Sequence, residues 1–343
     1  MTSTWEFAVL IIFIALVFDF ANGWHDSANS IATVVSTRVL TPLQAVAWAA
    51  FFNFVAFAIF GTAVAKTIAG DLVDIKKIAP EWQLWVLLSG LIGAIVWDVI
   101  TWYLGLPTSS SHALIGAYAG AAVTAHHAFT GILKASGWTK TLAFIVISPV
   151  VGLILGYAIM TAMLWLCRSR SPSQVDRFFR KGQLVSAALY SLGHGGADAQ
   201  KTMGIIAAVL VAANLSTTAT KVIPLWVVLS CHAAMGLGTL SGGWRIVHTM
   251  GARLTRLRPV GGFSAETAGA TSLFMAIFGG IPVSTTHTIT GAITGVGLVR
   301  RFHAVRWSVA RKVLWAWILT IPCSAAMAAA TFELVYFLRT LQH

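Results

Sequence analysis

Charged residues are scarce in this chain of 343 residues, where Asp, Glu, Lys and Arg together make up only 10% of the composition. Hydrophobic residues make up 57%, and the mean hydropathy is +0.80. The stretches 43–65, 141–166 and 267–299 contain no Asp, Glu, Lys or Arg, and each exceeds the roughly 20 residues that a helix needs to cross a bilayer. They do not alternate apolar and polar residues as barrel strands do. The scarcity of charge therefore excludes a soluble domain and predicts an all-α polytopic membrane protein.

Cysteine is also rare, with three residues in the whole chain. Cys167, Cys231 and Cys323 lie far apart among apolar segments, and their spacing matches no zinc motif. This distribution excludes a disulfide framework and a cysteine-based metal site.

Acidic residues number 11 against 23 Lys and Arg, which gives a formal net charge of +12. The positive charges cluster in three loops, 167–182, 244–259 and 300–312. Short basic loops between apolar segments indicate the cytoplasmic side of a membrane protein, so the charge does not require a nucleic-acid partner. Counting apolar segments outward from these loops predicts five segments in each half of the chain and both termini outside the cell.

Two motif types recur in the same order in the two halves. "PTSSSHALIGA" at 107–117 matches "PVSTTHTITGA" at 282–292, and "GWHDSANS" at 23–30 matches "GGADAQKT" at 195–202. The halves cross the membrane in opposite directions, so this predicts two inverted five-segment repeats, 1–166 and 184–343, joined by a basic cytoplasmic linker at 167–183. Inverted repeats with broken or re-entrant helices at the midplane are typical of secondary transporters, whose binding site lies there.

The hydroxyl-rich motifs predict an anion site. Ser and Thr at the start of an apolar segment cap a helix, so hydroxyls and free backbone amides converge at one point. A single copy would indicate an ordinary helix cap, but duplication favours binding of a ligand. The predicted anion-binding residues are Ser109, Ser110, Ser284, Thr285 and Thr286.

Carboxylates inside apolar segments predict a cation site. Asp26 and Asp198 occupy matching positions of the two halves, and an ionisable group within a membrane span is functional by default. Asn22 and Asn29 add amide oxygens suited to a hard cation such as Na⁺. We expect the first helix to break at this polar run so that backbone carbonyls complete the shell. The alternative for Asp26 and Asp198 is a structural pair with Lys201 or with a histidine. Residues that could support these ligands are His25, His112, His194, Gln200, Lys201 and His287.

The pairing of anion donors with carboxylates favours a protonated oxyanion. Phosphate near neutral pH keeps P–OH groups, which need acceptors, whereas sulfate only accepts hydrogen bonds. The combined site is therefore better suited to phosphate than to sulfate.

Four segments, 19–45, 105–117, 193–206 and 282–292, resemble the signature segments of the inorganic phosphate transporter (Pit-type) family. The resemblance covers essentially the whole chain. It implies phosphate uptake across the cell (plasma or inner) membrane, coupled to Na⁺ or H⁺ with no other cofactor, an inverted-repeat fold and often a homodimer. It also implies that Asp26, Asp198, Asn22 and Asn29 lie at the ion and phosphate site together with the hydroxyls named above. Ala197 stands where many relatives have Asn, which removes one amide from the second repeat.

Three alternatives stay open from the sequence. Some relatives carry sulfate, so a sulfate or other oxyanion permease of the same family is one. An intramembrane hydrolase would also place Ser, His and Asp in apolar segments, although symmetric duplication argues against a single nucleophilic triad. An anion channel is the third.

Overall fold

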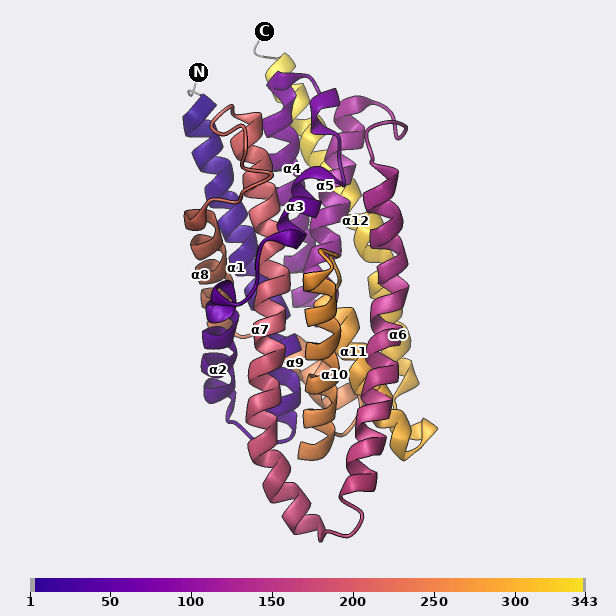
Figure 1. Cartoon of the computed structure of the whole chain (residues 1–343). Helices are drawn as coiled ribbons and strands as arrows, with labels where there is room; N and C mark the ends of the chain where they lie inside the picture. Colours follow the sequence, from indigo (N-terminus) through magenta and orange to yellow (C-terminus); the bar gives the residue numbers. More distant parts are fainter. Residues whose placement is uncertain (1–3, 342–343) are drawn as a thin grey trace.

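The structure is a computed structural model that describes residues 4–341, apart from the side chains of residues 252 and 253. It is an elongated helical bundle in which both ends of the chain lie at one end of the molecule and the loop between α6 and α7 lies at the other (Figure 1). The helices are α1 (Thr4–Ser36), α2 (Pro42–Val55), α3 (Ala63–Gly70), α4 (Pro80–Tyr103), α5 (Ser110–His126), α6 (Ala135–Leu166), α7 (Pro172–Ala212), α8 (Leu225–Ser241), α9 (Trp244–His248), α10 (Pro259–Phe278), α11 (Thr285–Arg300) and α12 (Trp307–Thr340).

The expected multi-pass helical architecture is confirmed. Within residues 4–341, four helices, α1, α4, α6 and α12, are long and apolar enough to cross a membrane. The α2–α3 and α8–α9 pairs bend by 81° and 62° and bring the number to as many as six if each pair is one span. The ten predicted segments overlap α1, α2 with the start of α3, α4, α5 and α6 in the first half and α7, α8, α10, α11 and α12 in the second. Two details differ: α9 falls outside the predicted segments, and α7 begins at Pro172, inside the predicted linker 167–183.

The turns after α4 and α10 have the same local structure. Gly105 and Gly280 each follow the helix in the left-handed conformation, with φ of 65° and 62°. The amide of the next residue bonds back to the fifth residue before it, Leu106 to Thr101 and Ile281 to Ala276, both at 2.9 Å. This is the Schellman ending, in which glycine takes the left-handed position without a steric cost. Pro then follows in each turn, at positions 107 and 282, and the helix cannot continue.

The predicted break of the first helix at its polar run is wrong. α1 is a continuous helix from Thr4 to Ser36 and passes through Asn22, Asp26 and Asn29 without interruption. α7 is likewise continuous through Asp198. Carbonyls freed by unwinding of α1 therefore do not contribute to a site. The side chains of a regular helix supply the polar groups instead.

The polar residues lie between two apolar clusters. On α1, Ile11 and Phe18 belong to one cluster and Ile31 to the other. On α7 the order is reversed, because Tyr190 belongs to the second cluster and Met203 to the first. The polar stretches 19–27 and 191–198 therefore sit at mid-height of the bundle, where α1 and α7 pass each other. Outward-facing side chains are apolar, as a lipid surface requires: Phe13 is 63% exposed, Ile154 58% and Ile318 54%.

Candidate functional site

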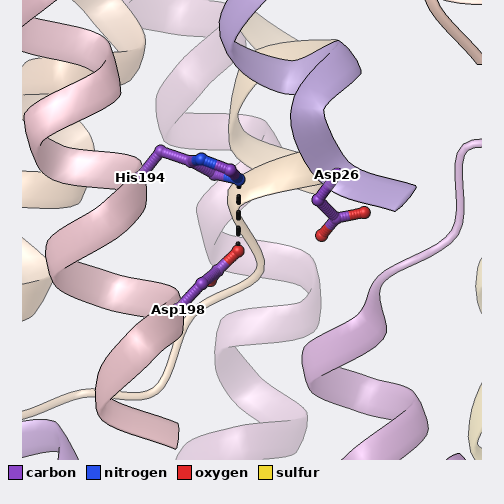
Figure 2. Close-up of side chains that lie close together, drawn as sticks. All are labelled: Asp26, His194 and Asp198. Atoms are coloured by element: carbon purple, nitrogen blue, oxygen red, sulfur yellow. Dashed lines mark ion pairs between the residues drawn. The ribbon is translucent and has the colours of Figure 1, made fainter. Parts of the chain in front are cut away.

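Asp26 and Asp198 lie in one site rather than two. Their carboxylates and the ring of His194 offer ligand atoms that all lie within 4.8 Å of one another (Figure 2). Asp26 comes from α1, whereas His194 and Asp198 come from successive turns of α7. All three side chains are at most 2% exposed. Two carboxylates this close and this deeply buried repel each other, so the site requires nearby positive charge or hydrogen-bond donors.

Asp26 is held by two neighbours. The Nδ1 atom of His25 lies 2.6 Å from Asp26 Oδ1, and the Thr286 hydroxyl donates to Oδ2 at 3.5 Å. The other ring nitrogen of His25 lies 3.0 Å from the Thr101 hydroxyl of α4. His25 therefore links the carboxylate to α4, which is the supporting role expected of it.

Asp198 has a positively charged partner. Lys201, one turn further along α7, donates from Nζ to Asp198 Oδ1 at 2.5 Å. The Thr285 hydroxyl donates to Asp198 Oδ2 at 3.0 Å. Lys201 also donates to the Ser111 hydroxyl and to the Val283 carbonyl, the latter at 2.9 Å. The ion pair considered as the alternative for Asp198 is therefore present, and it reaches both hydroxyl motifs.

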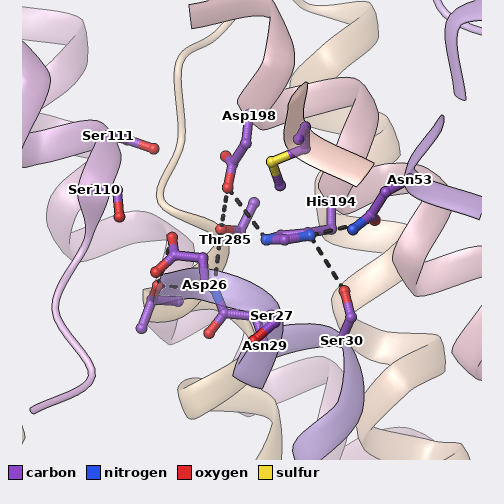
Figure 3. A network of polar contacts seen from close by, with 12 residues as sticks. Asp26, Ser27, Asn29, Ser30, Asn53, Ser110, Ser111, His194, Asp198 and Thr285 are labelled. Carbon is purple, nitrogen blue, oxygen red and sulfur yellow. Dashed lines mark hydrogen bonds and ion pairs between the residues drawn. The ribbon is translucent and has the colours of Figure 1, made fainter. Parts of the chain in front are cut away.

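The starts of α5 and α11 meet at this site. Ser109 and Ser284 act as the N-caps, because each hydroxyl accepts from the amide three residues later, at His112 and His287, at 3.2 Å. Helix geometry leaves the remaining amides of the first turn without an intrahelical acceptor. The side chains that follow the caps turn toward the aspartates (Figure 3). Ser111 bonds Lys201, Thr285 bonds Asp198, and the Ser110 hydroxyl lies 3.5 Å from His25 Nδ1.

Among the predicted anion-binding residues, Ser109 and Ser284 thus use their hydroxyls to cap the helices. The cap hydroxyl accepts from the third amide of its own helix, so it is directed toward the first turn of that helix. Ser110 lies beside His25, Thr285 beside Asp198 and Thr286 beside Asp26, so an anion-binding role for these three residues stays a prediction.

The amides complete an oxygen-rich environment. Asn29 donates from Nδ2 to the Thr285 and Thr286 hydroxyls at 3.3 and 2.9 Å. Within residues 4–341, the Oδ1 atoms of Asn22 and Asn29 are buried without a hydrogen-bond partner. Carboxylate, hydroxyl and amide oxygens are the ligands that hard cations prefer. The oxygen atoms around Asp26 are therefore suitable ligands for a hard cation.

A Ser–His–Asp series also occurs here. The Ser30 hydroxyl and the Asn53 carbonyl oxygen lie 3.2 and 3.3 Å from His194 Nδ1, and His194 Nε2 lies 3.3 Å from Asp198. In a hydrolase the aspartate is free to stabilise the imidazolium. Asp198 is instead neutralised by Lys201, and Ser30 is 1% exposed. The series is thus better suited to position His194 than to attack a substrate.

Three of the predicted supporting residues make no hydrogen bond to the aspartates among the described residues. Gln200 caps α3, because its Oε1 accepts from the Val64 amide at 2.9 Å. It lies two residues from Asp198, a spacing that places two side chains on different sides of a helix. His112 and His287 contact each other edge to face, with ring centroids 4.7 Å apart, and His287 stacks on Trp317.

Asp19 and Ser111 are two further buried polar residues that the sequence motifs did not assign to a site. Asp19 is fully buried on α1, and neither of its carboxylate oxygens has a hydrogen-bond partner in the described part of the chain. The available signal was the helical spacing of 19, 22, 26 and 29, which places all four side chains on one face. Ser111 belongs to the hydroxyl motif, but its partner Lys201 lies in the other half of the chain. The spacing within the motif therefore could not predict this contact.

Comparison with known proteins agrees with the motifs. A sequence model of the phosphate transporter family matches residues 22–174 and 167–328. A relative from Rhizobium meliloti (strain 1021), described as a "Probable low-affinity inorganic phosphate transporter", is 52% identical over 334 residues, covering 97% of this chain and 98% of the relative. A relative of the same description from Bacillus subtilis (strain 168) is 45% identical over 324 residues, covering 94% of this chain and 96% of the relative.

A solved structure described as "The sodium-dependent phosphate transporter" has the same fold. It superposes with a TM-score of 0.88 at 24% identity, covering 97% of this chain and 99% of that chain. The sequence matches extend over nearly the whole length of this chain and of the relatives. The chain therefore belongs to the phosphate transporter family.

Proposed function

We propose that this protein is a secondary transporter that imports inorganic phosphate together with Na⁺ or H⁺, by alternating access around the site between α1 and α7. One observation carries the proposal. The N-terminal turns of α5 and α11, with their unpaired amides and their hydroxyls, converge on two carboxylates that come from different halves of the chain. The descriptions of the relatives, which name inorganic phosphate, support the same substrate.

Phosphate suits this combination better than sulfate does. The amides and hydroxyls can donate to phosphate oxygens, the Lys201 ammonium adds positive charge beside them, and the helix dipoles of α5 and α11 favour an anion. The carboxylates of Asp26 and Asp198 can accept from P–OH groups, which sulfate lacks. Sulfate or another oxyanion is the second candidate.

The coupling cation would neutralise Asp26. Lys201 already neutralises Asp198, whereas Asp26 is supported by an imidazole and hydroxyl and amide groups. Adding a phosphate to this site adds more negative charge, which a sodium ion or a proton brought with it would balance. No other cofactor is proposed.

Matching contacts in the two halves support an inverted repeat of 1–166 and 184–343, joined by 167–183. α5 packs on α12, the last helix of the other half, and α11 packs on α6, the last helix of the first half. α1 packs on α8, and α7 packs on α2 and α3. The identical turns after α4 and α10 add local agreement. Every binding side chain described above is at most 3% exposed, so the site is closed to both sides in this conformation. Rocking one half against the other would open it.

We further propose that the protein lies in the plasma or inner membrane in contact with lipids, with its basic loops cytoplasmic, both termini external, and as a homodimer. The basic loop between α6 and α7 and the two ends of the chain lie at opposite ends of the molecule (Figure 1). Labelling of a cysteine placed at Ser173 from the external side alone would contradict this orientation. Light scattering of the detergent-solubilised protein tests the dimer.

Transport is tested in vesicles that contain the purified protein. We expect saturable uptake of radiolabelled phosphate that rises when an inward Na⁺ gradient or an inward proton gradient is imposed, with sulfate uptake much lower. Uptake that does not saturate and needs no cation gradient would instead favour a channel. Turnover of a phosphate ester without transmembrane movement would favour the hydrolase.

Hydroxyl substitutions separate helix capping from anion binding. Thr285→Val together with Ser110→Ala is expected to raise the half-saturating phosphate concentration by about 100-fold, because each hydrogen bond to a charged ligand contributes roughly 1.5–3 kcal/mol. Ser109→Ala and Ser284→Ala are expected to lower stability by about 1 kcal/mol each through the lost caps, with a much smaller effect on half-saturation. The measurements are phosphate uptake curves and thermal unfolding of each variant. Equal shifts in half-saturation for both sets would show that capping alone explains the motifs.

A further inference from the structure

The two halves carry different residues at one matching position. Asp26 is followed three residues later by Asn29 on α1, and Asp198 is followed three residues later by Lys201 on α7. The spacing is one helical turn in both cases, so both followers lie on the same face as their aspartate. The first half thus presents a neutral amide where the second half presents an ammonium.

The surroundings of the Lys201 ammonium match those of a bound cation. Its three N–H groups point to three oxygens of different kinds: the Asp198 carboxylate at 2.5 Å, the Val283 carbonyl at 2.9 Å and the Ser111 hydroxyl. These oxygens come from α7, the turn before α11, and the first turn of α5. An ammonium has three donors, so all of them are used. Lys201 is 1% exposed, so the ammonium is held inside the protein as a dehydrated ion would be.

The matching position in the first half has no such internal charge. Asn29 donates to Thr285 and Thr286, but its Oδ1 atom has no hydrogen-bond partner within the described chain. The Asp26 Oδ2 atom receives one long hydrogen bond, from Thr286 at 3.5 Å. His25 contacts Asp26 Oδ1, but Asp26 Oδ2 and Asn29 Oδ1 are available to an ion that comes from solution. In the second half, Lys201 already engages Asp198 Oδ1, the Ser111 hydroxyl and the Val283 carbonyl.

We propose that the Lys201 ammonium is a resident cation that permanently fills the cation position of the second repeat. An exchangeable sodium ion does not fit beside it, because both would compete for the same carboxylate, hydroxyl and carbonyl oxygens. The exchangeable cation position is then the one at Asp26, so each chain has at most one. The statement about coupling rests on the proposed function, but occupancy of the Asp198 position does not depend on transport.

An ordinary structural ion pair makes a different prediction. If Lys201 only pairs with Asp198, replacing it should lower stability whatever salt is present. If Lys201 stands in for a cation, a residue that frees the position and offers an oxygen should allow Na⁺ to enter. Lys201→Asn provides this, since it recreates the Asp-x-x-Asn arrangement of the first half. Lys201→Met is the matched control, because it removes the charge while filling similar volume with no oxygen ligand.

The first experiment measures thermal unfolding of the detergent-solubilised protein in NaCl, KCl and choline chloride at constant ionic strength. A ligand at 100 times its Kd stabilises enough to raise Tm by on the order of 5 °C in a chain of this size. We expect Lys201→Asn to gain a Na⁺-specific rise in Tm of this order beyond that of the unmodified protein. Lys201→Met should gain none. An equal Na⁺ response in Lys201→Asn and the unmodified protein would overturn the proposal.

The second experiment needs no stable variant at position 201. Binding of radioactive Na⁺ to the unmodified protein, counted per chain, is expected to reach at most one, and Asp26→Asn should remove it. Two ions per chain would overturn the proposal. Neither experiment measures uptake, so absence of phosphate transport would refute the proposed function while leaving this inference to be judged on Na⁺ binding alone.

Discussion

Asp26→Asn is expected to abolish cation-coupled phosphate uptake, with the initial rate falling at least about 100-fold. Asn has nearly the same shape as Asp, so its Oδ1 atom can still lie against His25, which contacts Asp26 at 2.6 Å. What is lost is the negative charge at the position where an exchangeable cation would bind. A hydrogen bond or contact to a charged group contributes roughly 1.5–3 kcal/mol, and a cation makes several such contacts through this carboxylate. The measurement is gradient-driven uptake by equal amounts of monodisperse protein.

Glu266→Gln is the control for Asp26→Asn. Glu266 is also a fully buried carboxylate, and it accepts from Gln183 at 2.8 Å and from Ser186 at 2.5 Å. Gln183 and Ser186 lie on α7, more than two helical turns before His194, and Glu266 lies on α10. We expect Glu266→Gln to keep most of its uptake. Normal transport by Asp26→Asn, or an equal loss in both variants, would show that the Asp26 charge has no specific role in coupling.

The multi-pass helical architecture could be predicted from the sequence, because the length of the apolar segments indicates helices that cross a membrane. Each expected segment overlaps a helix, and the family suggested by the four signature segments is confirmed by the comparisons. A segment within lipid must satisfy its backbone hydrogen bonds internally, so a sufficiently long apolar segment predicts a helix. The inverted relation of the halves, the membrane sidedness and the identity of the cation stay predictions.

The position of the helix breaks could not be judged from the polarity of side chains. The polar run around Asp26 predicts a break in the first helix, yet α1 is regular there. The neighbouring α7 and α11 supply hydrogen-bond partners for the polar side chains, so the backbone does not need to unwind. The signal that did mark the breaks was backbone chemistry. Gly105 and Gly280 stop α4 and α10 in the left-handed conformation, and Pro107 and Pro282 exclude continuation.

Helical periodicity explains which of the predicted residues lie together. Asn29 follows Asp26 by three positions, and His194 precedes Asp198 by four, so each lies on the same face as its aspartate. Gln200, two positions from Asp198, lies on another face and caps α3. The sequence carries no comparable spacing signal for contacts between the two halves of the chain. That Ser111 would meet Lys201, or that Asp26 and Asp198 would share one cluster, depends on how α1, α5 and α7 pack.

Asp198→Asn is expected to be damaging in a different way from Asp26→Asn, because it leaves Lys201 as an unpaired buried charge. Lys201 is 1% exposed, and its remaining acceptors, Ser111 and the Val283 carbonyl, are neutral. Breaking a buried ion pair by removing one partner costs roughly 3–5 kcal/mol. We therefore expect a sharp loss of folded protein, measured as the yield of monodisperse protein after detergent extraction.

Adding Lys201→Met to Asp198→Asn should restore part of that yield. Replacing both members of a buried ion pair by neutral residues of similar volume is often close to neutral, whereas either single replacement leaves one charge alone. The four proteins form a double-mutant cycle, and we expect the double variant to be more stable than the sum of the single changes predicts. Transport need not return, since the double variant also lacks the positive charge of Lys201 and the carboxylate acceptor that Asp198 offers to phosphate. If Asp198→Asn is instead well folded and transports phosphate without cation dependence, the exchangeable cation belongs to the second repeat and the roles assigned to the two aspartates are reversed.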